Sequence, residues 1–247
     1  MNDATAQHCP NPWSVSVITL MPEMYPGPLE HSIIGQAYTS KRFTLDIIKL
    51  RDFGVGAHQK VDDSPYGGGA GMVIKPDVMH DAIIAAREAQ PDATLVHLTP
   101  RGQRLTQPIL AELVQKPLIL MCGRYEAIDE RVIVAHAPRE ISLGDFVLTG
   151  GDIAAMAIIE GCVRLLPDVV GDAASLGEES FGMSEDYACL LEYPHYTKPP
   201  IWNGMAVPDV LSSGHHAHVA QWRKQQAERV TESRRPDLWQ RYKQEKQ

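Results

Sequence analysis

The sequence predicts an α/β domain with a parallel sheet, followed by a small all-helical module. Between residues 13 and 170, short apolar runs alternate with amphipathic stretches, which is the pattern of strands joined by crossover helices. A long irregular segment and then a basic stretch of helical character complete the chain. With 247 residues, 44% of them hydrophobic, the chain has enough apolar material for one large domain or two modest ones.

Three apolar runs are the predicted strands. Residues 13–20 alternate and run into a turn with three prolines, MPEMYPGP. Residues 94–100 and 117–123 are short apolar runs closed by Pro or Gly, as in parallel strands buried on both faces.

Helices are predicted over residues 75–90, 106–116 and 150–167. Pro76 opens the first, Thr106 is placed to cap the second, and Pro167 stops the third, which is mostly apolar. Residues 168–208 are rich in Gly, Pro, acids and aromatics, and a loop this long is usually functional or a linker.

The last predicted helix covers residues 213–235 and has a basic face, and Pro236 separates it from a final basic segment. Its expected apolar anchors are Val219, Trp222 and Val230.

Charge is distributed unevenly along the chain. The formal net charge of −8 argues by itself against a nucleic-acid partner. Residues 214–247 nevertheless hold eight Lys and Arg against four acids, a net charge of +4, so the remainder carries −12. Residues 165–192 contain seven carboxylates and neither Lys nor Arg. This division predicts two functional regions, of which the basic one suits phosphate.

Membrane, disulfide and zinc chemistry have little support in the sequence. There is no run of 18 apolar residues, and residues 1–12 lack the basic and apolar parts of a secretory signal, so we expect a loose extension and a cytoplasmic protein. The four cysteines form no CxxC pair, and Cys122 and Cys162 lie in apolar runs typical of core positions. The other two cysteines are Cys9 and Cys189. The ten histidines form neither an HExxH motif nor the spacing of a Ser/His triad, so no metal site is predicted.

Residues 61–72 read VDDSPYGGGAGM and form the densest glycine cluster. Glycines let a ligand or another backbone approach closely, and their N–H groups can bind anions. The spacing fits neither GxxxxGK[ST] nor GxGxxG. A flexible surface turn is the alternative interpretation.

Two further loops follow predicted strands or enter a helix. Residues 122–132, CGRYEAIDERV, follow the end of an apolar strand, which is where open α/β sheets bind ligands. The alternative there is a solvated helix start, because Glu126 and Glu130 are spaced four apart. Residues 142–156, SLGDFVLTGGDIAAM, offer bare backbone suited to a flat uncharged ring, or a helix entry with Asp152 in its first turn.

The paired acids of GEESF are Glu178 and Glu179, and the nearest upstream cation is Arg164. A carboxylate beside an arginine could act as a base with an oxyanion stabiliser, although most such pairs are simply exposed charge.

Taken together and in order, these segments resemble the bacterial tRNA (guanine-N1)-methyltransferase family, TrmD. The matching strings, spread over residues 20–223, are LMPEMY, RDF, VDDSPYGGGAGM, LTPRGQRL, LILMCGRYEAIDERV, SLGDFVLTGGD, VRLLPDVVG, EESF, PHYTKP and SGHHAHVAQWR.

The resemblance implies a SPOUT-type parallel sheet with a C-terminal trefoil knot that holds S-adenosylmethionine, in a homodimer. It implies a knotted domain over residues 13–167, a linker and active-site loop over 168–208, and a helical tRNA-binding domain over 209–247. The implied reaction methylates N1 of guanosine 37 in the anticodon stem-loop of tRNA, with S-adenosylmethionine as the methyl donor.

The resemblance also implies roles for individual residues. Glu179 corresponds to the family's general base, and Arg164 to the arginine that steadies guanine O6. The implied cofactor-binding residues are Leu98, Gly123, Tyr125, Glu126, Leu143, Gly144, Asp145, Phe146, Val147, Leu148, Gly150 and Gly151. The implied tRNA-binding residues are Asp62, Gly71, Ser175, His215 and Arg223.

This chain departs from the family pattern at four places. Glu179 replaces an aspartate, Met21 a phenylalanine, Ala127 a glycine, and SGHH replaces SGNH or SGDH at His215. Two alternatives stay open: a SPOUT methyltransferase acting on another RNA position, and an RNA-binding homologue with weakened catalysis.

Overall fold

The computed structural model describes residues 12–171, 175–182, 184 and 186–246. Its contacts divide the chain into two compact units, Met1–Gly171 and Asp172–Gln247. Cys9 and residues 1–11 of the expected N-terminal extension lie outside the described residues. Among the residues described, no helix combines the length and apolar character that crossing a membrane requires.

A parallel sheet forms the centre of the first unit. Within the described residues it has the strand order β2-β1-β6-β5-β8, and every neighbouring pair is parallel. The bounds of its strands are β1 Trp13–Thr19, β2 Phe43–Lys49, β5 Thr94–Arg104, β6 Leu118–Cys122 and β8 Arg139–Ser142. The predicted parallel sheet is therefore confirmed.

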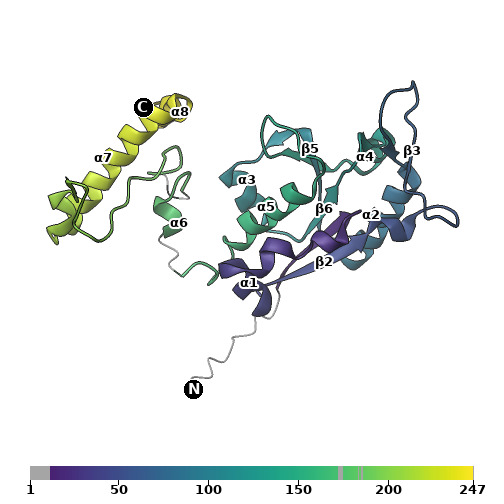
Figure 1. Cartoon of the computed structure of the whole chain (residues 1–247), viewed down its shortest axis with the longest axis horizontal. Helices are drawn as coiled ribbons and strands as arrows, with labels where there is room; N and C mark the ends of the chain where they lie inside the picture. The colour runs from purple at the N-terminus through teal and green to yellow at the C-terminus, as the bar shows by residue number, and fades with distance from the viewer. Residues whose placement is uncertain (1–11, 172–174, 183, 185, 247) are drawn as a thin grey trace, which may run out of the picture. The chain divides into compact units, whose positions relative to one another are not determined.

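Helices cover both faces of this sheet. Their bounds are α1 Ser32–Thr39, α2 Pro76–Ala89, α3 Gln107–Leu113, α4 Glu130–His136 and α5 Asp152–Val163. Apolar side chains of α1, α3 and α5 form one core with one face of the strands, and those of α2 and α4 form a second core with the other face. Figure 1 shows α3 and α5 on one side of β6, and α2 and α4 on the other.

The central strand β6 explains why both faces are buried. Its residues are all buried, and Leu118, Leu120 and Cys122 join the first core. Ile119 and Met121 join the second. Because successive side chains of a strand point to opposite faces, a continuous apolar run supplies two cores.

Shorter elements complete the first unit. They are the 3-10 turns η1 Pro22–Met24, η2 Gly27–Glu30 and η3 Leu50–Phe53, and the strands β3 Asp62–Asp63, β4 Val73–Ile74 and β7 Ala127–Ile128. The last three strands form a second small sheet, in which β4 pairs with β3 on one side and with β7 on the other. This small sheet brings the two ends of the glycine cluster next to the loop that follows β6.

Several predicted elements differ in extent from the observed ones. The strand predicted over 94–100 continues to Arg104, and the helix predicted over 106–116 ends at Leu113. The sequence did not predict α1, β2 or β8, and it offered a helix start near α4 only as an alternative interpretation. The strand β2 has a half-exposed pattern with charged residues, and α1 has only eight residues, one of them glycine, which is short for a periodic signal.

The interpretation of residues 126–130 as a helix start is wrong for Glu126. The strand β7 lies between Glu126 and Glu130, and α4 begins only at Glu130. Asp129 caps the helix by accepting a hydrogen bond from the backbone N–H of Arg131.

The second unit combines helices with a short hairpin. Its elements are α6 Ser175–Glu178, β9 Ile201–Trp202, β10 Met205–Ala206, η4 Asp209–Ser212, α7 His216–Arg234 and α8 Pro236–Glu245. A small core holds Tyr187, Leu190 and Tyr193 together with Ala227 of α7 and Tyr242 of α8. The buried residues of α7 are Ala227 and Thr231, whereas the anchors predicted from the sequence are only half-buried.

Candidate active site

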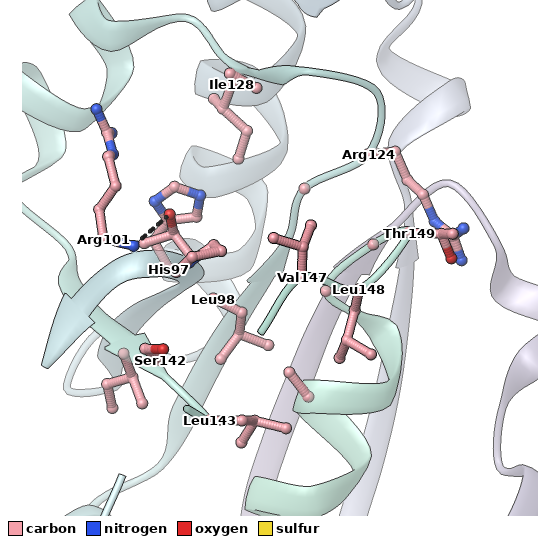
Figure 2. A pocket seen from close by; sticks show the side chains of 18 of the residues that line it. His97, Leu98, Arg101, Arg124, Ile128, Ser142, Leu143, Val147, Leu148 and Thr149 are labelled. Atoms are coloured by element: carbon pink, nitrogen blue, oxygen red, sulfur yellow. Dashed lines mark hydrogen bonds between the residues drawn. The ribbon is translucent and has the colours of Figure 1, made fainter. Parts of the chain in front are cut away.

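A cavity of about 370 Å³ lies in the first unit, where β6 ends and the regular ladder of β5 is interrupted. Three segments line it: residues 97–101 of β5, the loop 123–128 after β6, and, from the end of β8 to the start of α5, residues 141–144 and 146–151 with Ala154. In Figure 2, Leu98, Val147 and Leu148 lie together, with His97 and Arg101 to one side and Arg124 to the other. The carboxyl ends of parallel strands are the usual place for a ligand in an open α/β sheet.

A bulge in β5 shapes one wall of the cavity. Leu98 and Gln103 both pair with Ile141 of β8, so residues 99–102 are displaced from the regular ladder. Thr99, Pro100 and Arg101 of this bulge line the cavity. Gly102 is required there, because a Cβ at this position would be 2.3 Å from the backbone nitrogen of Ile141.

Two glycines allow the third segment to pass close to β6. The N–H of Gly151 donates a hydrogen bond of 2.9 Å to the carbonyl of Gly123. A Cβ on Gly151 would be 2.8 Å from the Cα of Cys122, and one on Gly150 would be 2.5 Å from Nε of Arg124. At Gly150 and Gly151 the chain therefore passes too close to β6 and to Arg124 for a side chain to fit without a shift.

A buried ion pair fixes the entry to α5. Asp152 is fully buried, and its Oδ2 accepts hydrogen bonds of 3.0 and 2.7 Å from Nε and Nη2 of Arg124. Its Oδ1 accepts one of 2.5 Å from the hydroxyl of Thr19 on β1. The guanidinium of Arg124 points away from the cavity (Figure 2), so this arginine holds the loop 123–128 to α5.

Two further side chains surround Asp152. The hydroxyl of Tyr25 lies 3.3 Å from Oδ1 of Asp152 and 3.6 Å from Sγ of Cys122. Burial, with the nearby Cys122 and Asp152, raises the pKa of Tyr25, and burial likewise raises the pKa of the Cys122 thiol. Both groups are therefore neutral, and Cys122 is the core residue that the sequence predicts.

His97 is a wall residue that the sequence reading missed. It is 6% exposed, and its Nδ1 lies 3.3 Å from Oε1 of Glu140. Arg101 also contacts Glu140, at 3.5 Å. Burial lowers the pKa of His97, although Glu140 opposes the shift. Its only sequence signal is a single polar residue within the apolar run of β5.

The glycine cluster meets the loop after β6 at Glu126. The N–H of Glu126 donates to the carbonyl of Met72 at 3.0 Å. Gly71 has a φ of +81°, and a Cβ there would be 2.4 Å from Cγ of Glu126. The structure thus brings Gly71 beside a residue that lines the cavity. Asp62, half-buried in β3, lies on the same small sheet.

Eleven of the twelve residues expected to bind the cofactor line the cavity. Asp145 is not among the described lining residues. Its side chain is 86% exposed, and its Oδ2 lies 2.5 Å from Nη2 of Arg104.

The two residues expected to perform the chemistry belong to different units. Arg164 is the C-cap of α5 in the first unit and is half-buried. Glu179 directly follows α6 in the second unit and is also half-buried.

The remaining residues expected to contact tRNA also lie in the second unit. Ser175 begins α6, and its side chain is outside the described part. His215 is exposed as the N-cap of α7, and Arg223 lies on α7 with its Nη1 3.6 Å from Glu178.

Comparison with known proteins shows the family of the chain. The family model described as "tRNA (Guanine-1)-methyltransferase TrmD" matches residues 13–241. The chain belongs to the TrmD family. This TrmD match extends over nearly all of the described residues of both units.

Among the relatives, the tRNA (guanine-N(1)-)-methyltransferase of Rhodospirillum rubrum is 51% identical over 227 residues, 92% of each chain. The protein of the same name from Novosphingobium aromaticivorans is 48% identical over 231 residues, 93% of this chain and 92% of the relative. The protein of the same name from Nitrobacter winogradskyi is 50% identical over 228 residues, which are 92% of this chain and 93% of the relative.

Proposed function

We propose that this protein transfers a methyl group from S-adenosylmethionine to N1 of guanosine 37 of tRNA. The observation that carries the proposal is the cavity at the ends of β5 and β6, which eleven of the twelve expected cofactor residues line. Membership of the TrmD family and the names of its relatives support the same activity.

The cavity is suited to S-adenosylmethionine. Its volume of about 370 Å³ falls in the range of small-molecule sites. Apolar side chains such as Leu98 and Leu148 offer contact to a flat ring, and Gly123 and Gly151 also line the cavity without adding a side chain to it. When bound there, the cofactor supplies a methyl group on a sulfonium that is already activated for transfer.

The residues of the chain must then accept a proton from the guanine and stabilise the negative charge that develops on it. Guanine N1 carries a proton at neutral pH, so a carboxylate must accept it as the new bond to the methyl group forms. Glu179 takes this role, one methylene longer than the family's aspartate. Arg164 stabilises the negative charge that builds on O6. Removing the target base from its stack costs about a few kcal/mol.

The tRNA is held by residues of both units in this proposal. Asp62 and Gly71 contact the target guanosine and its neighbour. Ser175 and His215 belong to the contacts with the anticodon stem-loop, and the basic helices α7 and α8, the first of which carries Arg223, supply a surface for phosphate.

The fold-level proposals concern the knot, the domains and the dimer. The close passage of Gly151 against Cys122 supports a trefoil knot in which residues 144–151 thread past β6. Four exposed apolar residues line the cavity and a fifth lies in the first turn of α5, and a second copy of the chain in a homodimer would cover them. They are Tyr125, Phe146, Val147, Leu148 and Ile153.

We also propose that residues 13–167 are the catalytic domain, 168–208 the linker with the base, and 209–247 the tRNA-binding domain of a cytoplasmic enzyme.

The deciding experiment is methyl transfer from labelled S-adenosylmethionine to two tRNA transcripts that differ only in having guanosine or adenosine at position 37. We expect label in the guanosine transcript and background in the other. Equal labelling of both would point to another RNA position, and absence of labelling with intact tRNA binding would point to an RNA-binding homologue.

A further inference from the structure

The adjacent glutamates at the end of α6, Glu178 in its last position and Glu179 directly after it, have different roles within the second unit. Oε2 of Glu178 accepts a hydrogen bond of 3.2 Å from the hydroxyl of Tyr193. The same oxygen lies 3.6 Å from Nη1 of Arg223 on α7. Glu178 is therefore committed to an internal network, immediately before the residue proposed as the base.

Tyr193 lies at the centre of this network. It is 8% exposed and belongs to the small core with Ala227 and Tyr242. Cζ of Arg223 lies 4.9 Å from the centre of its ring, where the face of the aromatic ring attracts a cation. Burial raises the pKa of Tyr193 to about 12, so its hydroxyl remains a donor to Glu178 at neutral pH.

Backbone hydrogen bonds tie the turn that follows Glu179 to the segment 190–192. The N–H of Gly182 donates to the carbonyl of Glu179 at 2.8 Å, and the N–H of Phe181 donates to the carbonyl of Leu190 at 3.0 Å. The hydroxyl of Ser180 accepts from the N–H of Glu192 at 2.9 Å. The position of Glu179 is therefore linked to that of the neighbouring segment.

That segment is itself bound to α7. The N–H of Leu191 donates to the hydroxyl of Thr231 at 2.8 Å, and this buried hydroxyl donates to the carbonyl of Ala227 at 2.7 Å. The contact between Glu178 and Arg223 adds a direct link from α6 to the same helix.

We propose that Glu178, Tyr193 and Arg223 are positioning residues that hold Glu179 at a defined place relative to α7. The proposal rests on the proposed role of Glu179 as the base. It assigns Arg223 to a carboxylate and an aromatic ring instead of to tRNA phosphate. Helix α7, which is proposed to contact the tRNA, is thereby connected to the turn that holds Glu179.

The network acts on rate more than on stability. An ion pair this exposed, with side chains 40% and 50% exposed, contributes little to folding. Catalysis is more sensitive, because a displacement of about 1 Å can reduce a rate about 10²-fold. Loosening the network should therefore slow the chemical step in a protein that remains folded.

The test compares Glu178→Gln, Arg223→Gln, Tyr193→Phe and the Glu178→Gln/Arg223→Gln double variant in single-turnover methyl transfer. Enzyme and S-adenosylmethionine are in excess over a tRNA transcript with guanosine 37. The matched control is Asp237→Asn, which breaks an exposed pair of 2.6 Å with Arg235 in the same unit. Cofactor and tRNA dissociation constants are measured for each protein.

We expect Glu178→Gln and Arg223→Gln each to lower the single-turnover rate by about tenfold or more, with both dissociation constants within about twofold of wild type. The double variant should lose no more than the slower single variant, because both changes release one network. Arg223→Lys, measured in the same assay, should retain part of the single-turnover rate that Arg223→Gln loses. Rates that stay at the wild-type value, losses that multiply in the double variant, or a loss in Arg223→Gln that lies only in tRNA affinity would overturn the proposal.

A second measurement does not depend on activity. Hydrogen exchange of the Phe181 and Gly182 amides should accelerate in Glu178→Gln and Arg223→Gln but not in Asp237→Asn, and unchanged exchange would overturn the proposed coupling. If the wild-type protein transfers no methyl group at all, the proposed function fails, whereas the exchange result still decides whether Arg223 holds this turn.

Discussion

The two units hold their functional residues by different means. In the first, glycines let the loop before α5 pack closely against β6, and the buried Arg124–Asp152 pair fixes the loops behind the cavity. In the second, we propose that the base is held by the partly exposed pair of Glu178 and Arg223 together with the buried Tyr193. A site for a constant cofactor can be rigid and pre-formed, whereas a group that must meet a large RNA can rest on weaker contacts.

The largest expected effect separates the two units by function. Glu179→Gln should lower the single-turnover rate about 10²- to 10⁴-fold, the usual contribution of general acid–base catalysis. The dissociation constant for S-adenosylmethionine, measured by calorimetry, should not change, because the expected cofactor residues lie in the other unit. Glu232→Gln, an exposed acid on α7, is the control. A fully active Glu179→Gln protein would show that another group accepts the proton.

The next effect concerns the stability of the first unit. Asp152→Asn leaves Arg124 without its carboxylate partner in a buried setting, which should lower the free energy of unfolding by about 3 kcal/mol. Asp145→Asn breaks the exposed pair with Arg104 and should cost less than about 1 kcal/mol. Urea denaturation measures both. Similar losses in the two variants would contradict the distinction between a buried and an exposed pair.

A smaller effect tests the close packing of Gly151 against β6 beside the cavity. In Gly151→Ala the new Cβ would meet the Cα of Cys122 at 2.8 Å, so the loop must move. We expect a loss of about 1–3 kcal/mol in cofactor binding, about 10- to 100-fold in the dissociation constant. Gly171→Ala is the matched control, because a Cβ there has no described atom within 4 Å. Equal cofactor binding by the two variants would argue against a wall in close contact with β6.

The smallest effect is a pH dependence of the first unit. Burial lowers the pKa of His97 below that of the unfolded chain, near 6.5, so the unfolded state binds more protons between the two values. Stability should therefore fall as pH is lowered through this interval, by at most about 1.4 kcal/mol per pH unit for one proton. Urea denaturation at pH 7, 6 and 5 should show a shallower decline for His97→Gln. An equal decline in both proteins would assign the effect to other groups.

The central elements of the fold follow from local patterns. The apolar runs around β1, β5 and β6 and the amphipathic period of α2 identify these elements because each buries its own side chains. The edge strand β2 and the short strand β8 have no such signal, since β2 is half exposed and β8 has four residues. The bulge in β5 depends on Gly102 meeting Ile141, which lies far away along the chain.

The site shows the same division between local signal and long-range contact. The glycine-bearing loops mark the cavity in the sequence, and eleven of their expected cofactor residues meet there. His97 and the clamp on Arg124 were not predictable, because their partners Glu140 and Asp152 lie 43 and 28 positions away. The exposed side chain of Asp145 likewise depends on how its loop is folded, not on the motif that contains it.

The sequence by itself determined the parallel α/β architecture, the glycine-bearing loops and the membership of the TrmD family. These features depend on neighbouring positions: apolar periodicity, the residues that begin or end helices and turns, and the family motifs. The sequence itself therefore shows them. Only the tertiary structure decided that Arg124 faces Asp152 and that Glu178, next to the proposed base, faces Arg223. These contacts join residues 28 and 45 positions apart, and they form only after burial has placed the helices and strands.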